Sequence, residues 1–168
     1  GEIAKTLVDF IQENGGIITE DDMAAYEAKW RTPITFNYDD LKIISAPPPS
    51  SGGICLAQIM KMIEPFPLDE FGHNSAKSIQ VITEAERRSY ADRNFHLGDP
   101  DFVNIPTEEL ISTEYSNDRM SSFSFEKATK SSDLSHGNVH IIESNETTHY
   151  SIIDQFGNAI SATTTLNA

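Results

Sequence analysis

Residues 147–167 read TTHYSIIDQFGNAISATTTLN, and this stretch decides the fold class of the chain. Polar and apolar residues alternate on both sides of a central Gly-Asn pair, a combination that predicts two strands joined by a turn. With a five-residue loop, antiparallel pairing joins Ile153 to Ala159 and, counted outward, Thr147 to Thr165. The stretch is therefore predicted to be a β-hairpin that places two threonine hydroxyls side by side.

One face of this hairpin is predicted to be polar and the other apolar, because successive side chains of a strand point to opposite faces. The polar face carries Thr147, His149, Ser151, Ser161, Thr163 and Thr165, and the apolar face carries Tyr150, Ile152, Ile160, Ala162 and Leu166. Threonine is common in strands because its branched side chain suits a pleated surface, so β-propensity alone explains a Thr-rich strand. The chemical alternative is a threonine nucleophile.

A threonine nucleophile depends on its surroundings, because its hydroxyl is weakly nucleophilic at its free pKa. A neighbouring hydroxyl can orient it, and a base must accept its proton. One source of that base is the α-amine of the threonine itself, which requires the threonine to be an N-terminal residue. In this chain such chemistry requires a cut immediately before Thr147.

The first 120 residues are predicted to be mainly helical, with one β-hairpin between about 34 and 45. The expected further elements are a helix over the first dozen residues, a helix from Thr19 that ends before Pro33, a rigid loop over 47–53, a helix from Leu56 to a stop at Pro65, a helix capped by Asn74 or Ser75 that runs to about Arg93, and a helix capped by Thr107 that carries Leu110, Ile111 and Tyr115. On the helix that follows Ser75, the side chains of Ile79, Ile82 and Ala85 are expected to face inward.

The composition is that of an ordinary globular chain, with 38% apolar and 23% charged residues. The 26 acidic and 12 basic residues give a net charge of −14, which argues against a nucleic-acid partner because binding a phosphate backbone needs a surface rich in Lys and Arg. The single cysteine, Cys55, excludes an internal disulfide. The chain opens inside a helical pattern and stops inside a strand pattern, so we expect an excerpt of a longer protein.

A Ser-rich connector is predicted between the helical part and the terminal hairpin. The stretch from Ser121 to Gly137 holds six serines and shows little apolar periodicity, which is typical of an exposed segment. The sequence therefore predicts three parts, which are a mainly helical part over 1–120, a connector over 121–146 and a hairpin over 147–168.

The motifs of this chain together resemble γ-glutamyltransferase, a family also called γ-glutamyltranspeptidase. The resemblance is carried by the two strand motifs of the terminal hairpin and by Gly16-Ile17-Ile18-Thr19 leading to Tyr26, Arg31-Thr32-Pro33, the Pro-Pro-Pro-Ser-Ser-Gly-Gly loop at 47–53, Tyr90-Ala91-Asp92-Arg93, and Leu97-Gly98-Asp99-Pro100-Asp101-Phe102. One small departure is Ile160, where the family motif usually has valine.

The resemblance implies an α+β chain that is a fragment of an N-terminal-nucleophile hydrolase with the αββα fold. Such a protein is made as a precursor that cleaves itself before the nucleophile into a large and a small subunit, and the matching bond here is Glu146-Thr147. By the same matching, Thr147 corresponds to the nucleophile and Thr165 to the hydroxyl bonded to it. Asn167 corresponds to a side chain that contacts the α-substituents of the bound glutamyl group.

The activity implied is transfer of the γ-glutamyl group of glutathione or a related amide to an amino acid, a peptide or water. The implied partners are these small molecules and the remainder of both subunits, without a cofactor, and the implied location is periplasmic or extracellular. The fragment alone is expected to be inactive. Two alternatives are another amidase or acylase of the same superfamily and a catalytically silent relative that retains the fold.

Other constellations favour structural roles. His136 and His140 have the spacing of two metal ligands on a helix, but Gly137 and Asn138 between them make a helix improbable, so no metal site is assigned. Cys55 is expected to be a buried hydrophobic residue. The resemblance places the arginine that holds the substrate carboxylate upstream of this chain, so the arginines present are expected to be solvated or ion-paired; they are Arg31, Arg87, Arg88, Arg93 and Arg119. Two acids are expected to be turn or cap residues, namely Asp99 and Asp101.

Overall fold

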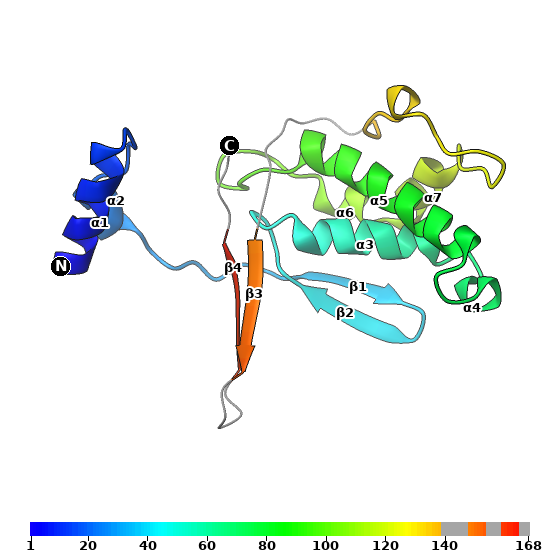
Figure 1. Ribbon diagram of the computed structural model, residues 1–168, viewed down its shortest axis with the longest axis horizontal. Coiled ribbons are helices and arrows are strands. Elements are labelled where there is room, and N and C mark those ends of the chain that lie inside the picture. The colour runs from blue at the N-terminus through cyan, green and yellow to red at the C-terminus, as the bar shows by residue number, and fades with distance from the viewer. Residues whose placement is uncertain (139–147, 154–158, 165–168) are drawn as a thin grey trace. The chain divides into compact units, whose positions relative to one another are not determined.

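The computed structural model describes residues 1–138, 148–153 and 159–164 of the chain (Figure 1). It divides into two compact units, Gly1–Thr32 and Pro33–Ala168. The α+β class expected from the sequence is confirmed, since both units contain helices and the second also contains two antiparallel strand pairs. The division after Thr32 was not among the boundaries predicted from the sequence.

The first unit consists of α1, Glu2–Glu13, and α2, Glu20–Ala25. Both predicted helices are confirmed. The Thr19 hydroxyl accepts the backbone N–H of Asp22, and the Asp22 carboxylate accepts the backbone N–H of Thr19, so the two residues form a reciprocal capping box. These bonds satisfy two backbone donors and explain why α2 begins where it does.

The second unit opens with a hairpin of β1, Ile34–Tyr38, and β2, Leu41–Ser45, as predicted. Asp39 adopts a φ of 51°, in the left-handed region that a tight hairpin turn requires. The hairpin packs on α3 through Ile34 and Phe36, which are buried, whereas Leu41, next to the turn, is exposed. The predicted single buried face is thus present over most of the hairpin's length.

Helix α3 spans Gly52–Ile63, which corrects the expectation that 47–53 lacks regular structure. The two glycines form the first helical turn and neither has a positive φ. A Cβ at Gly53 would collide with the carbonyl oxygen of Ala46 and lie 3.0 Å from Ile34 Cγ1, so glycine is required here by a close approach of helix to hairpin. The predicted stop before Pro65 is confirmed.

Helix α4 spans Leu68–Phe71 and the long helix α5 spans Ala76–His96, with the Ser75 hydroxyl accepting the backbone N–H of Ser78 as its cap. The cap at Ser75 was predicted, but the prediction of which side chains of α5 face inward was only partly right. Ala85 is buried and Ile82 half-buried, whereas Ile79 is exposed. The residues that α5 buries are mostly polar or charged: Ser78, Val81, Glu84, Ala85, Arg88, Ser89, Asp92 and His96.

The single helix expected after Thr107 is two helices, α6 over Thr107–Leu110 and α7 over Thr113–Met120. Thr107 is inside α6 and makes no cap, which corrects the prediction, and the Ser112 hydroxyl instead caps α7 by accepting the backbone N–H of Tyr115. The break lets Leu110 and Tyr115 both enter the core beside α3. A short 3₁₀ turn follows at Ser131–Asp133.

Two apolar clusters form the core of the second unit, and α3 contributes to both. The first contains Ile34, Phe36, Ile54, Cys55, Ala57, Leu97, Leu110 and Tyr115, and the second contains Met62, Ala85 and Met120. Cys55 is buried, as expected, and burial raises the pKa of its thiol. In the described part of the chain, no helix combines the length and apolar character that crossing a membrane requires.

Candidate functional site

The terminal hairpin is present with the register that the sequence predicted. β3, Thr148–Ile153, pairs with β4, Ala159–Thr164, in antiparallel order, so that Ile153 lies opposite Ala159 and Thr148 opposite Thr164. The four residues assigned by resemblance lie just beyond these strands, outside the described residues: Glu146, Thr147, Thr165 and Asn167. The structure therefore confirms the predicted register of the hairpin, whereas the assignment of these four residues rests on the resemblance.

A buried carboxylate on α5 organises the polar side chains that lie upstream of this hairpin. Asp92 is 1% exposed, and both of its oxygens accept two donors. Oδ1 accepts the backbone N–H of Gly137 at 2.8 Å and lies 3.0 Å from Arg119 Nη2. Oδ2 accepts Arg119 Nε and Gln58 Nε2, each at 3.1 Å. A buried charge is tolerated when it is paired and hydrogen-bonded, and Asp92 meets both conditions.

The peptide group of Gly137 is held from both sides. While its N–H donates to Asp92, its carbonyl oxygen accepts Nε2 of His96 at 3.1 Å and Nδ1 of His136 at 2.9 Å. A carbonyl oxygen can only accept, so Nε2 of His96 carries a proton. Burial lowers the pKa of His96, which favours the neutral ring. Gly137 is itself buried, although it follows an exposed segment.

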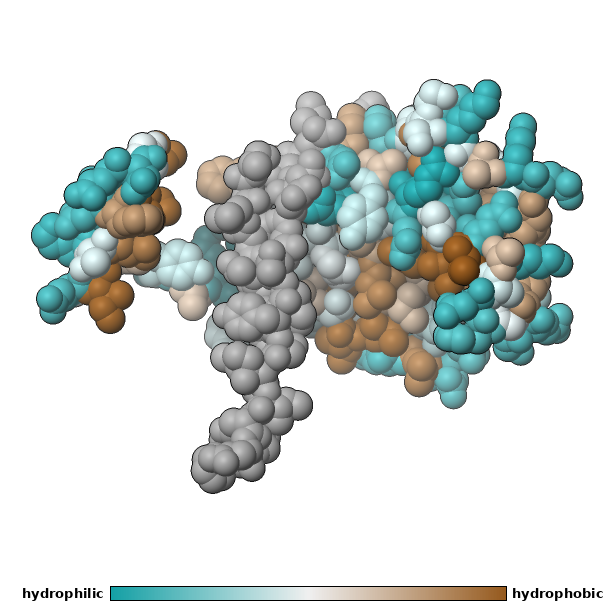
Figure 2. Space-filling model, viewed as in Figure 1, coloured by the Kyte–Doolittle hydropathy of each residue, from teal (hydrophilic) through white to brown (hydrophobic). Residues whose placement is uncertain are grey.

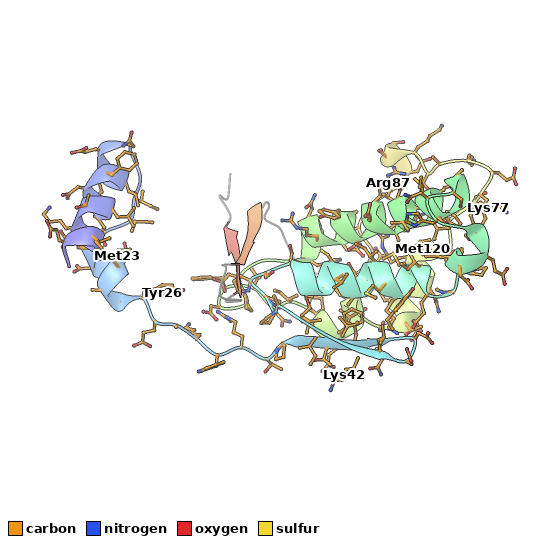
Figure 3. All side chains as sticks on the ribbon, turned by 60° about the horizontal axis from the view of Figure 1, so that its bottom comes forward. Met23, Tyr26, Lys42, Lys77, Arg87 and Met120 are labelled. Atoms are coloured by element: carbon orange, nitrogen blue, oxygen red, sulfur yellow. The ribbon has the colours of Figure 1, made fainter. Side chains whose placement is uncertain are left out.

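A second ion pair lies two turns earlier on α5. Arg88 is fully buried and its Nη1 contacts Oε2 of Glu84, while Arg87 Nη1 donates to Oε1 of Glu84 at 2.8 Å. The same side chains also bind the backbone of Thr129, in the segment 121–138. The Thr129 N–H donates to Glu84 Oε1 at 2.9 Å, and Arg87 Nη1 donates to the Thr129 carbonyl oxygen at 2.8 Å. Figure 3 shows Arg87 reaching from α5 toward this segment.

The Glu84 carboxyl has a strongly perturbed pKa. Burial alone would raise it, but the hydrogen bonds from Thr129 and Arg88 outweigh burial and lower the pKa to about 2. The Tyr115 hydroxyl shows the opposite result, because burial and the nearby Asp92 charge both raise its pKa. These shifts arise in an ion-pair network, so they indicate tightly held structure rather than groups poised for proton transfer at neutral pH.

The Ser-rich segment therefore differs from a loosely exposed connector in the described stretch 121–138. Most of its side chains are exposed, as predicted, but its backbone is tied down at Thr129, Ser135 and Gly137. Its first residues are held by aromatic contacts: Phe123 meets Phe66 edge to face at 5.4 Å, and Phe125 meets Phe71 at 5.6 Å.

The expectation that the arginines are structural holds for the three that form these ion pairs, Arg87, Arg88 and Arg119. The network itself was missed by sequence reasoning. A signal was present in the i, i+4 spacing of Glu84 and Arg88 and in the Tyr90-Ala91-Asp92-Arg93 motif, but neither predicts that the helix face is buried.

Metal-ligand geometry is absent from the described residues, where no group of three or more His, Cys, Asp or Glu side chains could hold an ion. The His136 ring stacks on Phe95, with ring centroids 3.4 Å apart and planes 8° from parallel. Its predicted companion, His140, lies outside the described residues. Asp99 accepts the backbone N–H of Asp101 at 3.0 Å, consistent with the predicted turn.

Comparison with known proteins gives one consistent result. The family model described as gamma-glutamyltranspeptidase matches residues 1–168. A glutathione hydrolase proenzyme of Escherichia coli (strain K12) is 44% identical over 99% of this chain and 29% of its own length. An Acylase ACY 1 proenzyme of Pseudomonas sp. (strain V22) is 34% identical over the same shares, 99% and 29%.

A solved structure agrees with these relatives. The crystal structure of Helicobacter pylori gamma-glutamyltranspeptidase superposes with a TM-score of 0.77 and 39% identity, covering 83% of this chain and 41% of that one. The chain thus spans about 29% of the length of the curated relatives it matches.

Proposed function

Because the chain belongs to the γ-glutamyltranspeptidase family, we propose that it is the part of a self-processing precursor that contains the cleaved bond, Glu146-Thr147, and the nucleophile, Thr147. The observation that carries this proposal is the register of the terminal hairpin. The described pair Thr148 and Thr164 is the last before the two residues assigned to the chemistry. One further step of the same register pairs Thr147 with Thr165.

The proposed chemistry uses one hydroxyl twice. The Thr147 hydroxyl first attacks the carbonyl carbon of Glu146, and the peptide C–N bond breaks as an ester forms. Water then hydrolyses the ester, which leaves Glu146 as a carboxylate and Thr147 with a free α-amine. That amine can accept the hydroxyl proton when Thr147 next attacks an amide carbonyl of a substrate. The amine of the substrate departs with a proton, and an acyl-enzyme remains.

The proposed substrates are glutathione and related γ-glutamyl amides, and the proposed acceptors of the acyl group are amino acids, peptides or water. Relatives named glutathione hydrolase proenzyme support the donor class. Thr165 is proposed to orient the nucleophile by a hydrogen bond, and Asn167 to contact the α-substituents of the glutamyl group. The remainder of both subunits completes the site, and we propose a periplasmic or extracellular location for the parent protein.

A second candidate function is hydrolysis of a different amide. The relative named Acylase ACY 1 proenzyme matches 99% of this chain at 34% identity, so a similar segment also occurs in a protein named as an acylase. We propose to separate the two functions by whether turnover requires an α-amine on the acyl group. A γ-glutamyl anilide and a glutaryl anilide, which keeps the carboxylate but lacks the α-amine, therefore distinguish them when supplied to the full-length protein.

The proposal is tested with full-length precursors that carry Thr147→Ala or the matched neighbour Thr148→Ala. Thr147→Ala is expected to abolish both processing, seen on a gel, and anilide turnover, because both steps use its hydroxyl. Thr148→Ala is expected to process and turn over substrate. Thr165→Ala is expected to slow processing and lower kcat, and Asn167→Ala to raise KM for the γ-glutamyl anilide. Normal processing by Thr147→Ala would refute the proposal, and an unmutated precursor without either activity would favour a silent relative.

A further inference from the structure

The buried hydrogen bonds of Gly137 join a segment outside the helices to the ion pair between α5 and α7. The pairing of Asp92 with Arg119 and Gln58 already satisfies its charge within α3, α5 and α7. The additional bond from Gly137 N–H holds a backbone group of a segment that forms neither helix nor strand there. Arg119 Nη2 also donates to the carbonyl oxygen of Ser135, at 2.8 Å. Two backbone groups of the segment, the Ser135 carbonyl and the Gly137 N–H, are thus tied to one ion pair.

Glycine is required at the centre of these contacts. A Cβ at position 137 would collide with the hydroxyl oxygen of Tyr115, and it would lie 2.7 Å from that ring's Cζ and 2.9 Å from Arg119 Cδ. Any larger residue must therefore move the segment away from α7 or displace the ion pair. We call the group of Asp92, Arg119, Tyr115, His96 and Gly137 the Gly137 clasp.

We propose that Asp92 is a positioning residue for self-cleavage, acting through the Gly137 clasp. The inference rests on the proposed function, because it concerns the Glu146-Thr147 bond. Glu146 lies nine residues after Gly137, and a chain spans at most about 3.3–3.6 Å per residue. The clasp therefore confines the cleaved bond to within about 30 Å of Gly137.

The expected size of the effect follows from the sensitivity of reactions to alignment. Self-cleavage needs the Thr147 hydroxyl aligned with the carbonyl of the preceding residue, and a displacement of about 1 Å can cost about 100-fold in rate. When the Gly137 N–H and the Ser135 carbonyl are both released, the nearest described backbone anchor is Thr129, so the unanchored stretch before Glu146 grows from 9 to 17 residues. We expect processing at least about tenfold slower.

The positioning role has a signature that a structural role lacks. After cleavage, Glu146 is no longer joined to Thr147, so the clasp no longer acts on the nucleophile. Loss of the clasp is therefore expected to slow processing while the processed molecules keep their kcat and KM for a γ-glutamyl anilide. General damage to the fold would lower turnover per processed molecule together with the rate of processing.

The test compares full-length precursors of the unmutated protein, Asp92→Asn, Gly137→Ala and Thr129→Ala. Asp92→Asn keeps the shape of the side chain but replaces one carboxylate oxygen by an NH₂ group. Because each oxygen of Asp92 accepts two hydrogen bonds, this NH₂ group faces two donors and can accept neither. Gly137→Ala changes no side chain of the ion pair itself, but the added Cβ would collide with Tyr115 and Arg119 and so forces the segment or these side chains to shift. Thr129→Ala is the matched control on the same segment, since it removes a hydroxyl bond to Arg88 upstream of the clasp.

We expect Asp92→Asn and Gly137→Ala to cleave at least about tenfold more slowly, Thr129→Ala within about twofold of the unmutated rate, and all processed fractions to share one kcat and KM. If Asp92→Asn shows no cooperative thermal unfolding and is therefore misfolded, the processing rate of Gly137→Ala alone tests the inference. Unmutated rates in both clasp variants would overturn the inference and leave the proposed function intact, as would an equal loss of turnover in the processed fraction. Failure of the unmutated precursor to cleave would refute the proposed function itself.

Discussion

The helices α1 and α5 bury opposite kinds of residue. α1 carries a regular apolar stripe, yet Ile3 is 88% exposed and Phe10 is 64% exposed, and apolar side chains are visible on its surface in Figure 2. α5 has a poorly separated pattern, yet it buries Arg88 completely and leaves Asp92 only 1% exposed. An amphipathic stripe therefore predicts a helix, but it does not say which side chains are covered by the rest of the chain.

The difference has a physical origin in the partners that each helix meets. The charged groups of α5 are covered because backbone groups of the segment 121–138 donate to and accept from them, which replaces the water they would lose on burial. In the described residues, α1 is met chiefly by the short helix α2, and Val8 is the residue of α1 that becomes buried. The following predictions test this contrast on the chain 1–168 by urea unfolding.

Arg88→Ala is expected to have the largest effect, a loss of about 3–5 kcal/mol in the free energy of unfolding, because it leaves the buried carboxylate of Glu84 without its closest partner. Arg87→Ala is the control, since its side chain is 26% exposed and shares the same carboxylate. We expect it to cost about 1 kcal/mol or less. Equal losses of unfolding free energy in the two variants would show that burial does not determine how much each ion pair with Glu84 stabilises the fold.

Lowering the pH is expected to remove about 3 kcal/mol through Glu84, whose pKa falls from 4.5 to about 2 on folding. A depressed carboxyl pKa stabilises the folded state above the unfolded pKa, so this contribution is complete above pH 4.5 and disappears as the pH falls toward 2. Urea midpoints between pH 6 and 2.5, compared for the unmutated chain and Glu84→Gln, measure it. Glu86→Gln, which replaces an exposed glutamate on the same helix, is the matched control.

Val8→Ala is expected to cost about 1.5 kcal/mol, the value of two buried methyl groups, because Val8 is 3% exposed. Thr19→Ala is expected to cost about 1 kcal/mol by removing the capping box of α2. Both changes affect the first unit, so their losses should appear in an unfolding transition that Arg88→Ala leaves in place. A single transition shifted by all three would show that the two units unfold together.

Phe10→Gln is expected to have the smallest effect, within about 0.5 kcal/mol, because its side chain is mostly exposed already. Urea unfolding beside Val8→Ala measures the two changes on one helix under the same conditions. A loss for Phe10→Gln as large as that of Val8→Ala would mean that the apolar stripe of α1 is covered in solution, and the contrast with α5 would no longer hold.

Local signals account for the elements that the sequence predicted correctly. The capping box at Thr19, the cap at Ser75 and the alternation over 34–45 each involve groups a few residues apart, so their geometry depends little on the remainder of the chain. The register of the terminal hairpin belongs to the same class, because its count depends on one turn.

Two of the failures concern contacts between distant segments. Gly53 lies in a helix, and glycine is needed there because Ala46, which follows β2, and Ile34 of β1 approach it closely. Ile79 faces solvent because the buried face of α5 is the one that meets α3 and α7. The helix predicted after Thr107 is broken before Ser112, which starts α7. The first two outcomes have no signal within a window of a few residues, whereas the cap that starts α7 is local and lies between Ser112 and Tyr115.

By itself, therefore, the sequence determined the class of the fold, the family and the pairing of the terminal strands, since these depend on motifs and periods that are read along the chain. Tertiary structure alone decided that Asp92 is buried and that Gly137, 45 residues later, donates to it. The reason is that a charged side chain can be solvated equally well by water or by backbone groups of a remote segment, and only packing selects between them.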